Sequence, residues 1–201
     1  MYSIIRLMIV GLFLGCSMVV AKKVKVNHKR IWNIVFLGLS VVLIIVLPFC
    51  PFENSVITFH SPEAAYEYYI LGKSNIKLVV EGKACDFVVD RQSDNDSYLM
   101  IPKTANGWKV GIGSSMKKVV QKIEDGVVVY VYQYKNTGDY FVTIHDTKGG
   151  TSMVSDEYNT TFYALDSESL NETLVTYYAY IPNFDSQYSI TVNGNNIVLQ
   201  S

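Results

Sequence analysis

Two apolar runs separated by a basic loop constrain this chain more than any other feature. The runs cover residues 3–21 and 31–50, and the loop covers residues 22–30. A helix of about 20 apolar residues crosses a bilayer core about 30 Å thick. Arg6, near one end of the first run, can extend its charge to the interface. We therefore predict that residues 1–50 form a transmembrane helical hairpin.

The loop predicts an orientation for this hairpin. It contains basic residues and no acid: Lys22, Lys23, Lys25, Lys29 and Arg30. Because positive charge in short loops stays on the cytoplasmic side, we expect a multi-pass protein of the cell membrane. Its N-terminus and everything after residue 50 would lie outside. The lipid bilayer is then an expected partner, and the loop suits anionic headgroups.

The first run also has features of a cleaved signal peptide. The stretch from Leu12 to Cys16 faintly resembles a lipoprotein cleavage box, although Phe13 stands where leucine is usual. Cleavage there would send the basic loop outward ahead of the second run. We favour a retained helix, and the sequence leaves processing open.

Residues 51–201 are long enough for one domain or two small ones. They contain eleven Lys and Arg against eighteen Asp and Glu, a net charge of −7. Such an acidic region argues against a nucleic-acid partner. Its single cysteine, Cys85, excludes a disulfide framework within it.

This acidic region has the pattern of a mainly β structure with one short helix. Ser61 is a good helix N-cap and Gly72 a good C-terminal cap. Short alternating strands follow, joined by hairpin signals such as Asn106-Gly107 and Asn193-Gly194. We expect an extracytoplasmic β-sandwich-like or meander domain, divided into an α+β subdomain at 53–115 and an all-β subdomain at 116–201.

The sequence gives only weak support for a metal site. Four oxygen ligands lie close together in the sequence: Asp90, Asp94, Asn95 and Asp96. The glycine and closing glutamate of a calcium loop are missing, so a solvated turn is the better interpretation. His60 and His145 have no partner at the spacing of zinc ligands. We expect no metal and no cofactor.

No catalytic motif is present, and we predict that the chain is not an enzyme. Cys85 has the sequence context of a small buried residue, and only conjecture would join it to His145. Tyr130, Tyr132 and Tyr134 share one face of a predicted strand and are candidates for a contact surface. Trp108 opens a strand whose apolar face we expect to be core.

Five stretches form a pattern: residues 61–69, 79–83, 102–103 with 106–109, 178–181 and 191–194. In these stretches the chain resembles a group of uncharacterised, two-span, membrane-anchored proteins of Gram-positive bacteria. The resemblance implies a short tether and an extracytoplasmic β-rich domain. It implies no activity and no functional residues.

Three functions are compatible with this pattern. The leading hypothesis is a non-enzymatic binding or sensing module that takes a protein or cell-envelope ligand. The alternative is a regulatory or accessory subunit that acts through its helices on another membrane protein. A cell-envelope enzyme is the third.

Overall fold

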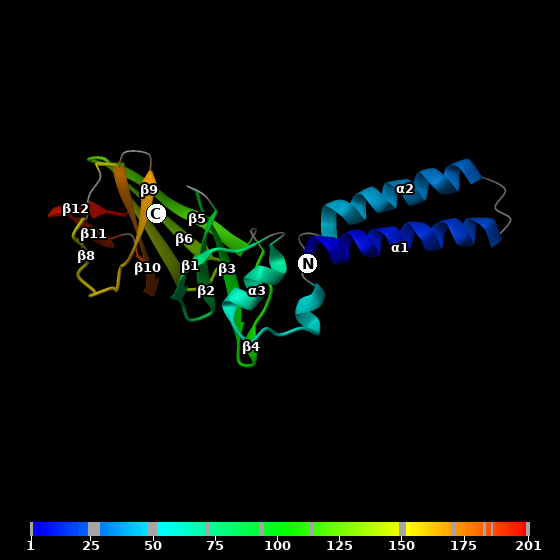
Figure 1. The fold of residues 1–201 in the computed structure, drawn as a ribbon, viewed down its shortest axis with the longest axis horizontal. Helices are drawn as coiled ribbons and strands as arrows, with labels where there is room; N and C mark the ends of the chain where they lie inside the picture. The colour runs from blue at the N-terminus through cyan, green and yellow to red at the C-terminus, as the bar shows by residue number, and fades with distance from the viewer. Residues whose placement is uncertain are drawn as a thin grey trace.

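The computed structural model contains an N-terminal helical hairpin and a β-rich region that lies beyond one end of it (Figure 1). The residues that the structure describes are 2–23, 29–47, 52–70, 73–92, 95–112, 115–148, 152–169, 172–182, 184–185 and 187–199.

The hairpin consists of α1 (Tyr2–Lys23) and α2 (Lys29–Val46), which run side by side (Figure 1). Aromatic side chains join the two helices. The ring of Phe36 on α2 lies 5.6 Å from the ring of Phe13 on α1, and 4.9 Å from the ring of Trp32 one turn earlier. Because the helices are antiparallel and similar in length, the start of α1 lies near the end of α2.

The predicted pair of transmembrane helices, over 3–21 and 31–50, is wrong. Within the described residues, no helix combines the length and the apolar character that crossing a membrane requires. The apolar part of α1 after Arg6 extends only roughly 22 Å and that of α2 roughly 24 Å at 1.5 Å per residue, against a bilayer core of about 30 Å. The predicted multi-pass localisation, and the orientation derived from it, are wrong for the same reason.

The hairpin nevertheless exposes many apolar side chains, which we call the apolar hairpin surface. Its members on α1 are Ile4, Leu7, Met8, Leu12, Met18, Val19 and Val20. Its members on α2 are Ile31, Ile34, Val35, Leu37, Leu39, Val41, Val42, Ile44, Ile45 and Val46.

The β-rich region begins with the short 3-10 helix η2 (Phe52–Ser55) and the helix α3 (Pro62–Tyr69). The predicted N-cap is confirmed, since Ser61 Oγ accepts a hydrogen bond from the Ala64 amide at 3.2 Å. The helix ends at the cap residue Ile70. The expected cap, Gly72, lies outside the described residues.

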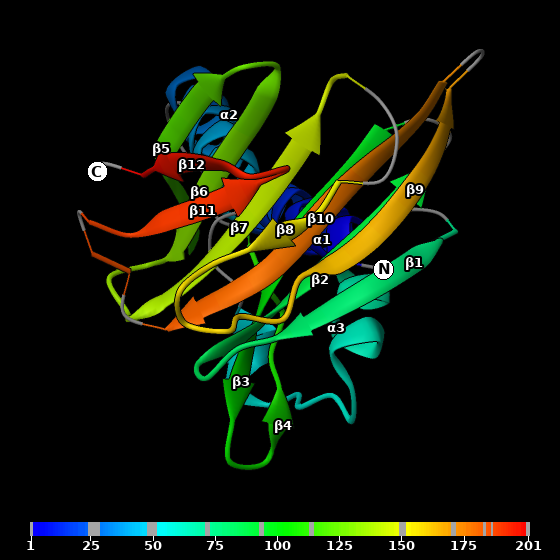
Figure 2. The same cartoon turned by 90° about the vertical axis from the view of Figure 1, so that its left-hand side faces the viewer.

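Three antiparallel sheets follow, as Figure 2 shows from the side of the β-rich region. The first contains β1 (Ile76–Glu81), β2 (Cys85–Gln92), β3 (Asn95–Thr104) and β4 (Gly107–Trp108), in that order. The second has the order β5-β6-β7-β10-β9, and the third the order β12-β11-β8. Their bounds are β5 (Met116–Glu124), β6 (Val127–Tyr134), β7 (Asp139–Asp146), β8 (Val154–Ser155), β9 (Tyr163–Ser169), β10 (Glu172–Pro182), β11 (Ser189–Val192) and β12 (Asn195–Val198).

The alternation of side chains along the strands builds these sheets into layers. On β6, Val129 and Val131 face a core shared with β11 and β12, whereas Tyr132 and Tyr134 face a core shared with the first sheet. The opposite face of the first sheet packs against α3. The β-rich region is therefore a stack of α3, the first sheet, the second sheet and the third, with a core in each of the three interfaces. The middle core contains residues from both expected subdomains.

Local turn signals predicted several connections correctly. Asn193 and Gly194 both have positive φ, 52° and 84°, as a type I′ hairpin requires. At the other predicted hairpin, Gly107 has φ +124°, and an added Cβ would meet the Phe59 carbonyl oxygen at 2.4 Å. The strand that we expect Trp108 to open does not continue past this residue, because β4 ends at Trp108. Trp108 is only half-buried, and its indole Nε1 donates to Asp86 Oδ2 at 2.5 Å.

Candidate functional site

The junction between the hairpin and the β-rich region contains a buried ion pair. Arg6 of α1 donates from Nη1 to Glu53 Oε1 at 2.5 Å and from Nη2 to Glu53 Oε2 at 3.0 Å. Its Nε donates to the Leu47 carbonyl oxygen at 2.8 Å, at the end of α2. The guanidinium also lies 5.1 Å from the centre of the Phe52 ring. One side chain thus connects α1, α2 and η2.

Both partners of this pair are almost fully withdrawn from solvent, with side-chain exposures of 6% for Arg6 and 4% for Glu53. Removing one partner of a buried pair leaves an uncompensated charge, which costs about 3–5 kcal/mol. The two parallel hydrogen bonds also fix the angle between the planar groups. The pair therefore holds the hairpin in one orientation relative to η2.

Tyr68 extends the network from this ion pair to α3. Its hydroxyl donates to Glu53 Oε1 at 3.4 Å. The pKa of Tyr68 is raised, first because the phenol is partly buried and then because the negative charge of Glu53 opposes a phenolate. Tyr68 therefore stays protonated and can keep donating to Glu53 in any ordinary buffer.

Tyr68 also lines an open hollow with a volume of about 860 Å³. The hollow lies between the first turns of α1, the segment before α3, and α3 itself. It is lined by Ile4, Thr58, Phe59, His60, Ala64, Glu67, Tyr68, Ile70, Lys73 and Ser74. We call it the junction hollow.

Hydrogen bonds within the chain hold the rim of the junction hollow. Lys109 Nζ donates to the Ile57 carbonyl oxygen and to Thr58 Oγ1, both at 2.8 Å. On the opposite rim, Ser74 Oγ donates to Glu67 Oε1 at 3.0 Å. Phe59 is held by a bridge to Trp108 at the end of the first sheet. The hollow therefore presents aromatic rings, acidic and basic groups and an exposed imidazole, and hydrogen bonds hold the segments that carry them in place.

The structure places the described ends of the predicted basic loop, residues 22–23 and 29–30, at the far end of the hairpin from this hollow. Lys22 and Lys23 end α1, and Lys29 and Arg30 begin α2. The Lys22 side chain is exposed. Lys25 lies outside the described residues.

The suggested oxygen ligands are used in contacts within the protein. Asp90 accepts a hydrogen bond from the Asn75 amide. Asp96 accepts from Arg91 Nε at 2.6 Å and from the Tyr178 hydroxyl at 2.6 Å. Burial favours the neutral form of Asp96, but these hydrogen bonds outweigh it and lower its pKa. Asp94 lies outside the described residues, as does the side chain of Asn95, and no metal-binding group is found among those that are described.

The candidate catalytic residues lie on different elements. Cys85 is fully buried on β2, and burial raises the pKa of its thiol, which disfavours the reactive thiolate. On β7, His145 Nδ1 lies 3.0 Å from Thr176 Oγ1, and burial lowers the pKa of the imidazole. His60 lines the junction hollow, to which neither Cys85 nor His145 contributes.

The tyrosine face proposed as a contact surface is mostly interior. Tyr132 and Tyr134 are buried between the first and second sheets, and Tyr130 packs beside them. Tyr130 also lies under the Lys118 ammonium, 5.1 Å from the ring centre. The alternation identified the shared face correctly but did not reveal that the first sheet covers it.

The sequence did not identify Glu53 or Tyr68 as site residues, although one signal indicates that Glu53 could pair with Arg6. An arginine inside an apolar helix requires a partner. Two antiparallel helices of similar length return the chain to the start of the first, and Glu53 is the first acid after α2. No comparable signal marks Tyr68, because it depends on where α3 packs.

Comparisons of the chain with protein families, with curated proteins and with solved structures give no match. The resemblance to two-span proteins of Gram-positive bacteria stays a prediction.

Proposed function

We propose that this chain is a non-enzymatic binding and sensing module whose ligand is a short protein segment bound in the junction hollow. The observation that carries the proposal is that Tyr68 belongs both to the hollow and to the buried Arg6–Glu53 pair. A ligand that contacts Tyr68 would alter the hydrogen bond to Glu53, and through Glu53 the attachment of the hairpin.

The chemistry of the lining supports a peptide ligand. Phe59 and Tyr68 offer aromatic surface, which is favoured in recognition sites because it combines area with few rotatable bonds. Glu67 and Lys73 bring opposite charges to the same hollow, and His60 adds an exposed imidazole. A peptide has apolar side chains, charged groups of both signs and backbone amides that match such a lining.

Selection from a library of displayed random short peptides on the full chain tests the proposal. We expect enriched peptides whose affinity falls about tenfold in His60→Ala and in Tyr68→Phe, because each variant removes a polar group of the hollow. The control is Tyr158→Phe, which removes a hydroxyl from an exposed ring elsewhere. Peptides that bind all of these variants equally well would contradict the site, as would a selection that enriches nothing.

A second candidate function has its own observation. Since Arg6 joins both helices to η2 by hydrogen bonds, the hairpin is mechanically suited to act on another protein as a regulatory or accessory subunit. Exchange of the hairpin after Arg6 for an unrelated helical hairpin, with Ile4 and Arg6 kept, separates the two functions because the junction hollow and the ion pair stay in place. If the exchanged protein still binds peptide and keeps its biological activity, the junction hollow carries the function. If it still binds peptide but no longer regulates a partner protein, the helices carry the function. A cell-envelope enzyme has the least support, because Cys85 and His145 lie outside the hollow.

A further inference from the structure

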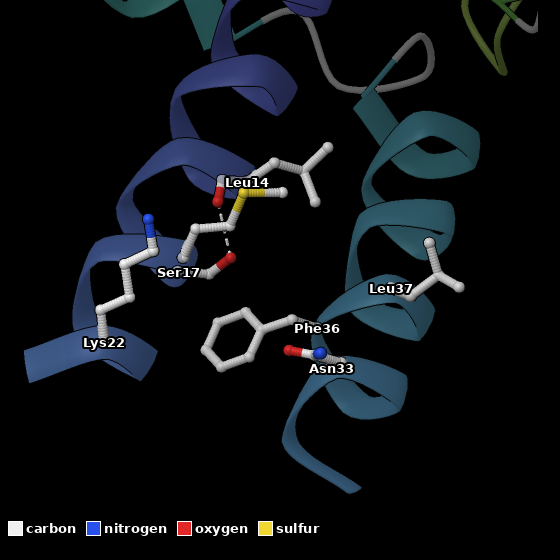
Figure 3. A pocket seen from close by; sticks show the side chains of 7 residues that line it. Leu14, Ser17, Lys22, Asn33, Phe36 and Leu37 are labelled. Carbon is white, nitrogen blue, oxygen red and sulfur yellow. Dashed lines mark hydrogen bonds between the residues drawn. The ribbon is translucent and has the colours of Figure 1, made fainter. Parts of the chain in front are cut away.

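A groove with a volume of about 480 Å³ lies between the two helices of the hairpin (Figure 3). Its apolar lining comes from both helices, with Leu14 and Met18 on α1 and Phe36 and Leu37 on α2. Two aromatic contacts to neighbouring residues of the hairpin hold the ring of Phe36 in place. The ring of Phe36 therefore forms one fixed wall of an apolar groove.

The polar groups of the groove lie toward the loop end of the hairpin. Ser17 and Lys22 contribute from α1 and Asn33 from α2 (Figure 3). The Ser17 hydroxyl donates to the Leu14 carbonyl oxygen at 2.7 Å, within its own helix. Lys22 is exposed and brings a positive charge to this end. The groove thus has an apolar body and a cationic end, which is the pattern that an amphiphile with an anionic head would match.

The apolar hairpin surface around the groove indicates what kind of occupant can cover it. Ile44, Ile45 and Val46 are consecutive in α2 and all three are exposed. Consecutive helical residues point about 100° apart, so these side chains face three different directions. A packed helix of a second copy covers only one stripe of a helix. Flexible acyl chains can cover all of these directions together.

The distribution of charge favours an anionic head at the loop. Residues 1–50 contain six Lys and Arg and no acid, and five of those six are in the loop at 22–30. The β-rich region at the opposite end is acidic. An anionic ligand is therefore attracted to one end of the hairpin and repelled from the other.

We propose that the hairpin binds an anionic phospholipid, with an acyl chain in the groove between α1 and α2 and the headgroup at Lys22. The apolar hairpin surface binds neighbouring lipid chains. This contact with lipid requires no helix to cross a bilayer. The groove and Lys22 share no residue with the junction hollow, so the lipid site stands independently of the peptide-binding function.

The test uses the full chain and the fluorescence of Trp32. The chain has two tryptophans, so Trp108→Phe leaves Trp32 as the single reporter beside the groove. We would mix this protein with vesicles of phosphatidylcholine alone, or of phosphatidylcholine with phosphatidylglycerol, and measure flotation and emission. Lipids brominated on the acyl chain quench a tryptophan that they touch.

We expect flotation with the anionic vesicles, a blue shift of Trp32 emission and quenching by brominated lipid. Lys22→Glu should weaken binding to these vesicles about tenfold, because it replaces an attraction with a repulsion. Lys117→Glu makes the same charge change on an exposed position of β5 and should leave binding unchanged.

Three results would overturn the proposal. Equal binding to both vesicle types, unaffected by Lys22→Glu, would show that the groove does not recognise an anionic head. Flotation without quenching of Trp32 would place the lipid elsewhere. A dimer in lipid-free light scattering, with Trp32 emission already blue-shifted and unchanged by vesicles, would show that a second copy covers the hairpin.

Discussion

The hairpin and the β-rich region use apolar side chains in opposite ways. The β-rich region buries most of its described large apolar residues in three cores between four layers. The hairpin leaves most of its described apolar residues exposed, and a buried ion pair joins it to η2. Large exposed apolar surface in a protein marks a place where something else binds. The comparison therefore places the internal stability in the β-rich region and leaves the apolar surface of the hairpin for the lipid contact that we propose.

The largest expected effect is on the middle core. Phe87 is fully buried between the first and second sheets, and its ring stacks 5.2 Å from that of Phe141. Phe87→Ala should lower the free energy of unfolding by about 4 kcal/mol, measured by urea denaturation of the β-rich signal in circular dichroism. The hairpin attachment should survive in conditions where the variant stays folded. An unchanged unfolding midpoint would contradict the layered core.

Arg6→Ala should affect the junction and spare the sheets. It leaves Glu53 buried without its cation, and we expect a local loss of about 3 kcal/mol. Hydrogen exchange at the Val56 and Ile57 amides, which donate to the Glu53 carbonyl oxygen, should accelerate about a hundredfold. Amides in β6 and β7 should keep their protection.

A double variant separates the charge of this pair from its packing. Arg6→Met combined with Glu53→Leu removes both charges and retains apolar volume, so much of the lost protection should return. If Arg6→Ala alone leaves the Val56 and Ile57 amides protected, the ion pair does not hold the junction.

A smaller effect is expected at Trp108. This side chain is half-buried, so it is neither fully buried like the cores of the β-rich region nor exposed like the surface of the hairpin. Trp108→Phe keeps an aromatic ring but removes the donor to Asp86, and should cost about 1.5 kcal/mol. The carboxylate keeps its ion pair with Lys103 at 2.8 Å, which limits the loss. Thermal unfolding measures it, and a fall as large as that of Phe87→Ala would show that the indole is a core residue.

The smallest expected effect is a pH dependence that His145 confers on the β-rich region. Burial lowers the pKa of His145 below its ordinary value of 6.5. As the pH falls through that value, the unfolded chain takes up a proton that the folded chain resists, so stability decreases until the lower folded pKa is reached. Unfolding midpoints measured across this range should show the slope, and His145→Gln should flatten it.

At lower pH, Asp96 should contribute in the same direction. Its folded pKa is lowered by Arg91 and Tyr178 against the effect of burial. Its stabilising contribution is therefore present above the ordinary carboxyl pKa and is lost as the pH falls toward the lower folded value. Asp96→Asn should remove this second slope. Because the Asp96 charge favours protonated His145, the same variant should lower the pKa of His145 further and extend its slope to lower pH.

The sequence predicted most of the local structure in the β-rich region. Alternation along β6 separated its valine face from its tyrosine face, and the cap at Ser61 placed the start of α3. The prediction from sequence failed where contacts with a distant element decide which strands pair and which faces are buried. β10 pairs with β7 across a long connection, and the small third sheet covers the valine face. No local pattern encodes such a pairing.

The candidate sites divide in the same way. The sequence by itself determined the two apolar helices, the charged loop between them and the acidity of the rest, because these are properties of composition and short periodicity. Only the tertiary structure decided that Arg6 pairs with Glu53, that Tyr68 joins this pair to a hollow, and that the tyrosines of β6 are interior. The physical reason is that these contacts join residues far apart in the chain. Their energies depend on burial and on the angle between groups, which exist only once the layers have packed.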